Sequence, residues 1–173
     1  MLSYSTDRIP AWKRSDVNVT VAEVCELLGP RAEESRVRLD CQLADSACEA
    51  DCDTEGVHRA VLNVVTNAMD AVDGRPDPRV VVSVGIDRSG DAVFVDVDDN
   101  GGGVAEDDLP RLFSLFASTK GARGTGLGLA VSQKIVGEHG GEIQVENRPG
   151  DGCRFRLTWP VENSSDSAGV AAE

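Results

Sequence analysis

The sequence has few aromatic residues and no long apolar run. Aromatic residues make up 4% of its 173 residues, so valine, leucine, isoleucine and alanine must supply most of a hydrophobic core. No stretch approaches the roughly 20 apolar residues of a membrane-spanning helix, and no secretory signal sequence is visible. We therefore expect a cytoplasmic domain, with any membrane attachment made by regions outside this sequence.

Positive charge is also scarce. The sequence has 17 basic against 30 acidic residues, a formal net charge of −13 at pH 7. Such a surface repels nucleic acid, so we expect no nucleic-acid partner. A site for a polyanion would have to be built locally, from backbone N–H groups, a metal ion and a few cations.

The five cysteines do not form a recognisable framework. Their number is odd, and no two are spaced as a C-x-x-C pair. We expect free thiols in a reducing compartment rather than a metal cluster or structural disulfides.

Hydrophobic periodicity predicts one α+β domain. Helical patterns cover residues 18–37, 53–72 and 126–138, and strand patterns cover 37–43, 79–98 and 141–160. This order predicts a two-layer α/β sandwich, with helices on one face of a mixed, mostly antiparallel sheet. We expect residues 1–18 to be a helix end and linker, 19–160 the domain, and 161–173 a disordered tail.

One predicted helix carries a polar stripe. Asn63, Asn67 and Asp70 recur at i, i+4 and i+7, on the side opposite a row of valines. Asparagine is a poor helix former, and its amide oxygen is a good ligand for a hard cation that also holds phosphates. The stripe is compatible with a cation site and equally with a solvated surface.

The predicted strand "AVFVDVDD" ends in an acid followed by glycines. Alternation places Asp99 on the same face as the strand's buried valines, where a carboxylate needs hydrogen-bond donors. It could cap the turn that follows, or accept from the amino group of a flat ligand such as adenine. Gly101 and Gly103 would let the backbone pass close to such a ring.

The stretch "TKGARGTGLGLAV" has four glycines in eight residues and leads directly into an apolar helix. Glycine-rich loops that open a helix are typical of phosphate binding. This loop lacks the lysine of a P-loop, and no buried strand precedes it, as a dinucleotide-binding turn requires.

Five motifs together resemble a known family. "NVVTNAMDAV", "DDNGGGV", "LFSLF", "GTGLGLA" and "GDGCRF" follow the order of the N, G1, F, G2 and G3 boxes of the GHKL, or Bergerat, ATP-binding fold. Sensor histidine kinases, type II topoisomerases and some chaperones share that fold. The chain is similar to the catalytic ATP-binding (HATPase) domain of bacterial sensor histidine kinases, especially the nitrogen-regulator type.

The resemblance implies a site for ATP and Mg²⁺. Asn67 would bind Mg²⁺, with Asn63 nearby, and Asp99 would bind adenine beside Gly101 and Gly103. Lys120 would reach the phosphates from a mobile lid and act with the two asparagines in catalysis. The other nucleotide-binding residues that the resemblance implies are Asp70, Phe113, Phe116, Thr119, Arg123, Gly124, Thr125, Gly126, Leu127, Gly128, Leu129 and Gly152.

One position bears on the reaction. Hydrolytic members of the superfamily place glutamate one helical turn before the Mg²⁺-binding asparagine, and this chain has Asn63 there. Because an amide cannot act as a general base, we expect slow ATP hydrolysis and a kinase. His58 and His139 lack the context of a phosphoacceptor motif, so the chain alone is not expected to autophosphorylate.

The resemblance thus implies a histidine protein kinase domain in two-component signalling. It would donate the γ-phosphoryl of Mg·ATP to a histidine on a separate phosphoacceptor hairpin domain. A response-regulator receiver domain would act after it in the signalling pathway. Two alternatives remain at this point. One is a serine kinase that acts as an anti-sigma factor on the same fold, and the other is a nucleotide-binding interaction module without catalysis.

Overall fold

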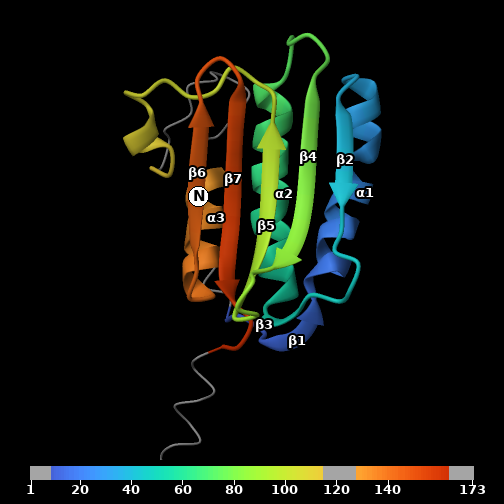
Figure 1. The fold of residues 1–173 in the computed structure, drawn as a ribbon, viewed down its shortest axis with the longest axis vertical. Coiled ribbons are helices and arrows are strands. Elements are labelled where there is room, and N and C mark those ends of the chain that lie inside the picture. Colours follow the sequence, from blue (N-terminus) through green and yellow to red (C-terminus); the bar gives the residue numbers. More distant parts are fainter. Residues whose placement is uncertain (1–8, 115–127, 164–173) are drawn as a thin grey trace, which may run out of the picture.

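A computed structural model describes residues 9–114 and 128–163 of the chain. Figure 1 shows a central sheet with helices behind it. The elements in chain order are β1 (Lys13–Asp16), α1 (Val17–Glu34), β2 (Arg38–Gln42), β3 (Glu49–Cys52), α2 (Thr54–Ala71), β4 (Arg79–Ile86), β5 (Ala92–Asp99), the 3₁₀ turn η1 (Leu109–Arg111), α3 (Gly128–Glu138), β6 (Glu142–Arg148) and β7 (Gly152–Pro160).

The main sheet has five strands in the order β2-β4-β5-β7-β6. Strand β2 is parallel to β4, while the pairs β4–β5, β5–β7 and β6–β7 are antiparallel. Strands β1 and β3 form a separate two-stranded antiparallel sheet. The prediction of a mixed, mostly antiparallel sheet is confirmed.

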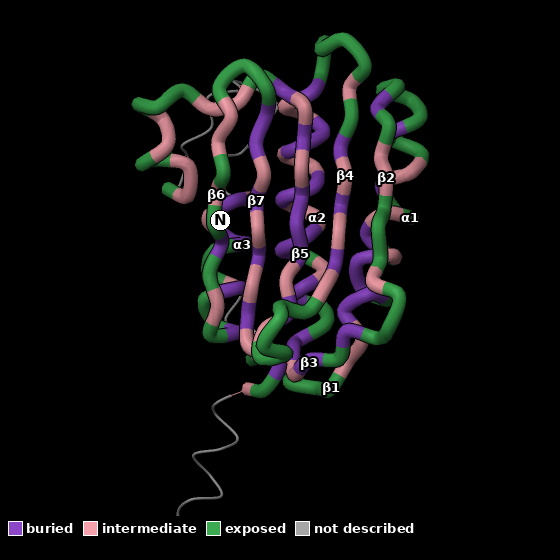
Figure 2. The backbone as a smooth tube through the Cα atoms, viewed as in Figure 1, coloured by how far each residue is buried: buried purple, intermediate pink, exposed green. Residues whose placement is uncertain are grey.

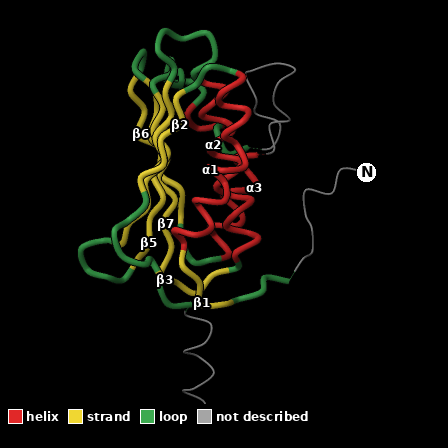
Figure 3. The backbone as a smooth tube through the Cα atoms, turned by 90° about the vertical axis from the view of Figure 1, so that its right-hand side faces the viewer, coloured by secondary structure: helices red, strands yellow, loops and turns green. Residues whose placement is uncertain are grey.

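The three helices pack on one face of this sheet, which makes two layers (Figure 3). Buried valines recur at every second position along β4 and β5 and face the helices, and the residues between them face outward. The tube in Figure 2 shows this alternation of buried and less buried positions along the central strands. The two largest fully buried side chains, Trp159 and Phe155, both come from β7. Valines make up much of the rest of the core between the layers, so few aromatic residues suffice.

Helix α2 is the helix that carries the predicted polar stripe. Its apolar positions recur at helical spacing and are buried, whereas Asn63, Asn67 and Asp70 are only half-buried. The helix ends at Ala71, followed by Gly74 in the left-handed region at φ +77°. It therefore runs from the β1–β3 end of the domain to the opposite end, where β5 finishes.

The folded domain is wider than the expected range 19–160. Strand β1 and the first turn of α1 lie before residue 19, and the N-cap Asp16 accepts from Asn18 N at 3.0 Å. At the other end, Val161 is buried, donates its N–H to Asp91 O at 2.9 Å, and accepts from Asp51 N at 2.8 Å. The guanidinium of Arg14 also donates to Val161 O, at 3.1 Å.

His139 joins the start of α2 to the end of α3. Its Nδ1 donates to Ile135 O at 2.7 Å, so its Nε2 is free to accept from Asp53 N, at 3.1 Å. The ring is 7% exposed and lies 4.6 Å from the ring of Trp12 and 6.0 Å from that of Trp159. Burial lowers the pKa of His139. These bonds give it a packing role, as expected for a histidine outside a phosphoacceptor motif.

Within the described ranges, no helix has both the length and the hydropathy needed to cross a membrane.

Candidate nucleotide-binding site

The predicted motifs meet at the end of the sheet where β5 finishes. Asn63 on α2 donates from Nδ2 to the carbonyl of Gly128, the first residue of α3, at 3.3 Å. A Cβ on Gly128 would lie 3.6 Å from Asn63 Cβ. The polar stripe of α2 therefore faces the start of the helix that follows the glycine loop, although 65 residues separate the two in sequence.

Asp99 lies at the last position of β5 and points to the helix side of the sheet, as alternation predicts. Its side chain is 4% exposed. Oδ1 accepts from Gly101 N at 2.9 Å and from Cys153 N at 3.4 Å. The carboxylate thus caps the glycine turn, which was the simpler of the two sequence interpretations. The same placement holds an acceptor in a fixed position beside the end of α2.

The glycines around Asp99 are required by close backbone approach. A Cβ on Gly101 would lie 2.6 Å from Ala71 O and 2.9 Å from Asp99 Oδ1. A Cβ on Gly152, whose φ is +99°, would lie 1.9 Å from Asp99 O. A side chain at either position would collide with these atoms, so the glycines allow the segments around Asp99 to pack closely.

Two turns are bonded into one unit beside Asp99. Gly150 N donates to Gly102 O at 2.9 Å. The Asn147 side chain accepts from Val104 N at 2.9 Å and donates to Val104 O at 2.7 Å. Such a pair of bonds imitates strand pairing, and it holds the chain where it leaves the G1 turn. Gly103 adopts φ +76° between these bonds.

Sequence reasoning missed Asn147 and Cys153 as parts of this site. The Cys153 thiol donates to Asn147 Oδ1 at 3.3 Å, and its backbone N–H reaches Asp99. Both residues flank the "RPGDG" turn, so the available signal was their position next to the G3 glycines. Arg75 is a further member, because its guanidinium donates to Gly150 O at 2.9 Å.

Of the two remaining residues of the polar stripe, Asp70 contacts α1. Asp70 forms a salt bridge with Arg31 of α1, with Nη2 to Oδ1 at 2.9 Å. This contact ties α1 to the end of α2. Asn67 lies one turn after Asn63 on the same face and is half-buried.

The other predicted nucleotide-binding residues divide into two groups. Phe113 is half-buried and meets Phe155 edge to face, with ring centroids 6.5 Å apart, and Leu129 belongs to the core. The rest lie outside the described residues; they are Phe116, Thr119, Lys120, Arg123, Gly124, Thr125, Gly126 and Leu127.

The donor set fits a magnesium–nucleotide complex better than a metal site made of protein side chains. Among residues 9–114 and 128–163, no group of three or more His, Cys, Asp or Glu residues could hold a metal ion. Mg²⁺ bound to a nucleotide needs only one or two protein ligands, since phosphates and water supply the others. The half-buried amide of Asn67, one turn after Asn63 on the same face of α2, would be one such ligand.

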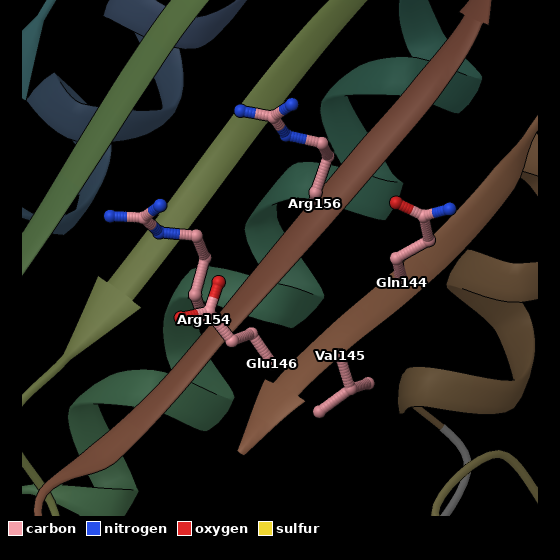
Figure 4. Close-up of a pocket in the computed structure, with 5 residues that line it drawn as sticks. All are labelled: Gln144, Val145, Glu146, Arg154 and Arg156. Atoms are coloured by element: carbon pink, nitrogen blue, oxygen red, sulfur yellow. The ribbon is translucent and has the colours of Figure 1, made fainter. Parts of the chain in front are cut away.

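A separate hollow lies on the outer face of the sheet. It measures about 580 Å³ and is lined by Gln144, Val145, Glu146, Arg154 and Arg156, from β6 and β7 (Figure 4). Both arginines are already paired with strand β5. Arg156 binds Asp96 with two contacts of 2.7 Å, and Arg154 binds Asp98 at 2.8 Å. This hollow is on the face away from Asp99 and carries no nucleotide feature.

Comparison with known proteins assigns the domain. A sequence profile of the family described as "Histidine kinase-, DNA gyrase B-, and HSP90-like ATPase" matches residues 52–163. The chain belongs to this family. The matched range includes α2, the Asp99 turn and the G3 turn, so the expected family and fold are confirmed, and ATP is the nucleotide of this ATPase-family domain. The nitrogen-regulator subtype stays a prediction.

Relatives of this ATPase-family domain include proteins named as kinases. It is 36% identical over 146 residues to the sensor histidine kinase ZraS of Escherichia coli K12, an alignment that covers 84% of this chain and 30% of ZraS. It is 33% identical to sporulation kinase E of Bacillus subtilis, with 90% and 20% of the two chains covered. The chain thus spans less than a third of the length of these relatives.

Solved structures agree with this assignment. The catalytic domain of the histidine kinase ThkA is 25% identical with a TM-score of 0.77, covering 88% of this chain and 99% of that one. Full-length ShkA in complex with AMPPNP is 26% identical with a TM-score of 0.78, covering 90% and 32%. ThkA in complex with the response regulator TrrA is 23% identical with a TM-score of 0.78, covering 94% and 45%.

Proposed function

We propose that this domain binds Mg·ATP at the end of the sheet near Asp99 and donates the γ-phosphoryl to a histidine on a separate phosphoacceptor hairpin domain. The observation that carries the proposal is the buried Asp99 carboxylate, fixed by Gly101 and Cys153, beside glycines where a Cβ would collide with the backbone. A fixed, desolvated acceptor of this kind selects an amino group on an otherwise flat ring.

The residues of the chain have separate roles in this proposal. Asp99 orients adenine, Asn67 holds the ion, and Asn63 holds the start of α3 through Gly128. A Mg²⁺ ion held at Asn67 would supply positive charge that offsets the charge of the phosphates. Lys120 in the segment after η1 supplies positive charge to the γ-phosphate. Because Asn63 cannot take a proton from water, the domain favours transfer to a protein acceptor over hydrolysis.

The partners belong to the same proposal. ZraS and sporulation kinase E are named as kinases, and ThkA has been solved with a response regulator. We infer a phosphoacceptor hairpin domain upstream of the folded region, joined through residues 1–12, and a response-regulator receiver domain as the final acceptor. We place the reaction in the cytoplasm. The names of these relatives favour the histidine kinase over the anti-sigma-factor alternative.

The adenine assignment is tested with two neighbouring acids on one strand. Asp99→Asn should weaken binding of a fluorescent ATP analogue by about tenfold to a hundredfold, since a charge-assisted hydrogen bond contributes roughly 1.5–3 kcal/mol. Asp98→Asn is the matched control, because Asp98 faces outward and pairs with Arg148 and Arg154. Equal binding by both variants would contradict the assignment.

The ion and the reaction are tested separately. Chelation of Mg²⁺, or Asn67→Ala, should weaken binding of the triphosphate more than binding of adenosine. Labelled ATP should leave the purified chain unlabelled and should label a histidine-bearing hairpin domain from a ZraS-type relative supplied in trans. Label on His58 or His139 would refute the proposal that the phosphoacceptor histidine lies on a separate domain. Fast ATP hydrolysis by the wild-type chain would refute the proposal that the domain favours transfer over hydrolysis.

A further inference from the structure

Two of the five cysteines face each other across the contact between α1 and β2. Cys41 pairs in register with Val82 on the parallel strand β4, and Leu39 pairs with Val80. Both valines are buried under the helices, and parallel partners share a face. Cys41 therefore lies on the helix side of the edge strand β2.

Cys25 approaches from the helix layer. It lies one turn after Val21 and directly after Val24, both fully buried, and its half-buried side chain packs against the core. The thiols of Cys25 and Cys41 are hydrogen-bonded to each other. Two thiols that share a hydrogen bond, one on α1 and one on the helix side of β2, form a pair that no feature of nucleotide binding uses.

The other three cysteines are buried in other places. The Cys48 thiol contacts Ser46 O at 3.9 Å, and the Cys153 thiol contacts Asn147 at 3.3 Å. Cys52 has a hydrogen bond to the Ser15 side chain. We propose that Cys25 and Cys41 form a reversible disulfide that fastens α1 to the edge strand β2, with a low-molecular-weight disulfide as the oxidant.

The two thiols have different reactivity. The hydrogen bond from Cys25 lowers the pKa of Cys41 to about 7, while the same bond and burial raise the pKa of Cys25. Cys41 is exposed, so near neutral pH it is the accessible thiolate and the attacking nucleophile. Cys25 stays protonated until Cys41 has reacted, which makes it the resolving thiol.

The exchange is balanced in two steps with glutathione disulfide as the probe. Cys41 thiolate attacks one sulfur of glutathione disulfide, forms a mixed disulfide and releases one glutathione thiolate. Cys25 then loses its proton, attacks the Cys41 sulfur and releases the second glutathione. The protein loses two protons and two electrons, and one glutathione disulfide becomes two glutathiones.

The bond would stabilise the edge of the sheet. Strand β2 is the edge strand next to β4 in the described sheet, and its helix side packs against α1. The disulfide would close a loop of about 16 residues, which in the chain-entropy treatment raises Tm by roughly 6–12 °C for a domain of this size. Asp99 lies on β5, two strands away, so affinity for an ATP analogue should stay unchanged.

The test exposes the full chain to glutathione buffers of stepped oxidised-to-reduced ratio. We expect the wild type to lose two of its five thiols, peptide mapping to join Cys25 to Cys41, and Tm to rise. The reaction should slow as the pH falls below about 7, and a reductant should restore both thiols.

Two single variants separate the steps. Cys25→Ser should stop at the mixed disulfide and gain one glutathionyl group at Cys41, whereas Cys41→Ser should not react. Cys48→Ser is the control and should form the disulfide like the wild type. The proposal is overturned if wild type keeps all five thiols in the oxidising buffers, if mapping finds another pair, or if Cys25→Ser gains no glutathionyl group. A failure of nucleotide binding would leave these readouts unaffected.

Discussion

Gly152 and Gly150 lie two residues apart in the turn between β6 and β7, and alanine substitutions there should have very different effects. Both glycines have positive φ, +99° and +80°. A Cβ on Gly150 would meet no atom within 4 Å, whereas a Cβ on Gly152 would lie 1.9 Å from Asp99 O. The pair therefore separates backbone strain from a collision with the strand that carries Asp99.

The magnitudes follow from these contacts. Either alanine carries the cost of a left-handed backbone, roughly 1–2 kcal/mol. Gly152→Ala must also push β5 and β7 apart by more than about 1 Å to reach a normal contact, which adds roughly 1–3 kcal/mol or more. We expect a total near 1–2 kcal/mol for Gly150→Ala and about 2–5 kcal/mol for Gly152→Ala. A domain stability of about 5–15 kcal/mol lets both variants fold.

Thermal denaturation and ATP-analogue titration measure the two effects. At about 2–4 °C per kcal/mol, the Tm of Gly152→Ala should fall well below that of Gly150→Ala. Its affinity should fall by about tenfold or more, because Asp99 no longer holds its position. Equal stability and equal affinity of the two variants would refute the argument that Gly152 exists to let the backbone approach Asp99.

Three further changes probe contacts away from the phosphates. Burial lowers the pKa of His139 in the folded state, so the unfolded chain takes up this proton at a higher pH than the folded chain. The free energy of unfolding should therefore fall as the pH drops below about 6.5, by at most about 1.4 kcal/mol per pH unit for one group. Urea denaturation at a series of pH values should show a shallower fall for His139→Gln. Asn147→Asp keeps the acceptor for Val104 N but loses the donor to Val104 O, and should cost about 1–2 kcal/mol by the same assay. Arg156→Met leaves Asp96, only 8% exposed, without its ion pair and should lower the free energy of unfolding by roughly 1–2 kcal/mol. Because the arginine is partly exposed, the loss should be smaller at high salt. A loss that does not depend on salt would point to packing instead.

Local patterns predicted the parts of this site that depend on one element at a time. The spacing of Asn63 and Asn67 placed them on one face of α2, and alternation placed Asp99 on the helix side of β5. These placements follow from helical and strand periods, which neighbouring residues determine. The helices and the strands of the main sheet were therefore predicted, whereas β1 was expected to be linker and α1 begins earlier than expected, at Val17.

Contacts between distant segments could not be predicted in this way. The partner of Asp70 is Arg31, 39 residues earlier, and no period links the two. The bonds from Asn147 to Val104 join β6 to a loop 43 residues away. Strand β2 pairs in parallel with β4 across α2 and β3. Such pairs depend on how the elements pack, so the sequence alone did not reveal Asn147, Cys153 or the contact between Cys25 and Cys41.

The bonds at Val161 have a mechanical consequence. Arg14 and Asp51 meet Val161 at the start of β5, since Val161 N donates to Asp91 O, while Asp99 ends the same strand. The eight residues of β5 span about 25 Å from one end of the strand to the other. A rotation of about 20° about the β1 end would carry Asp99 through about 9 Å. A turn of the domain about that end would thus move Asp99 much farther than the residues around Val161.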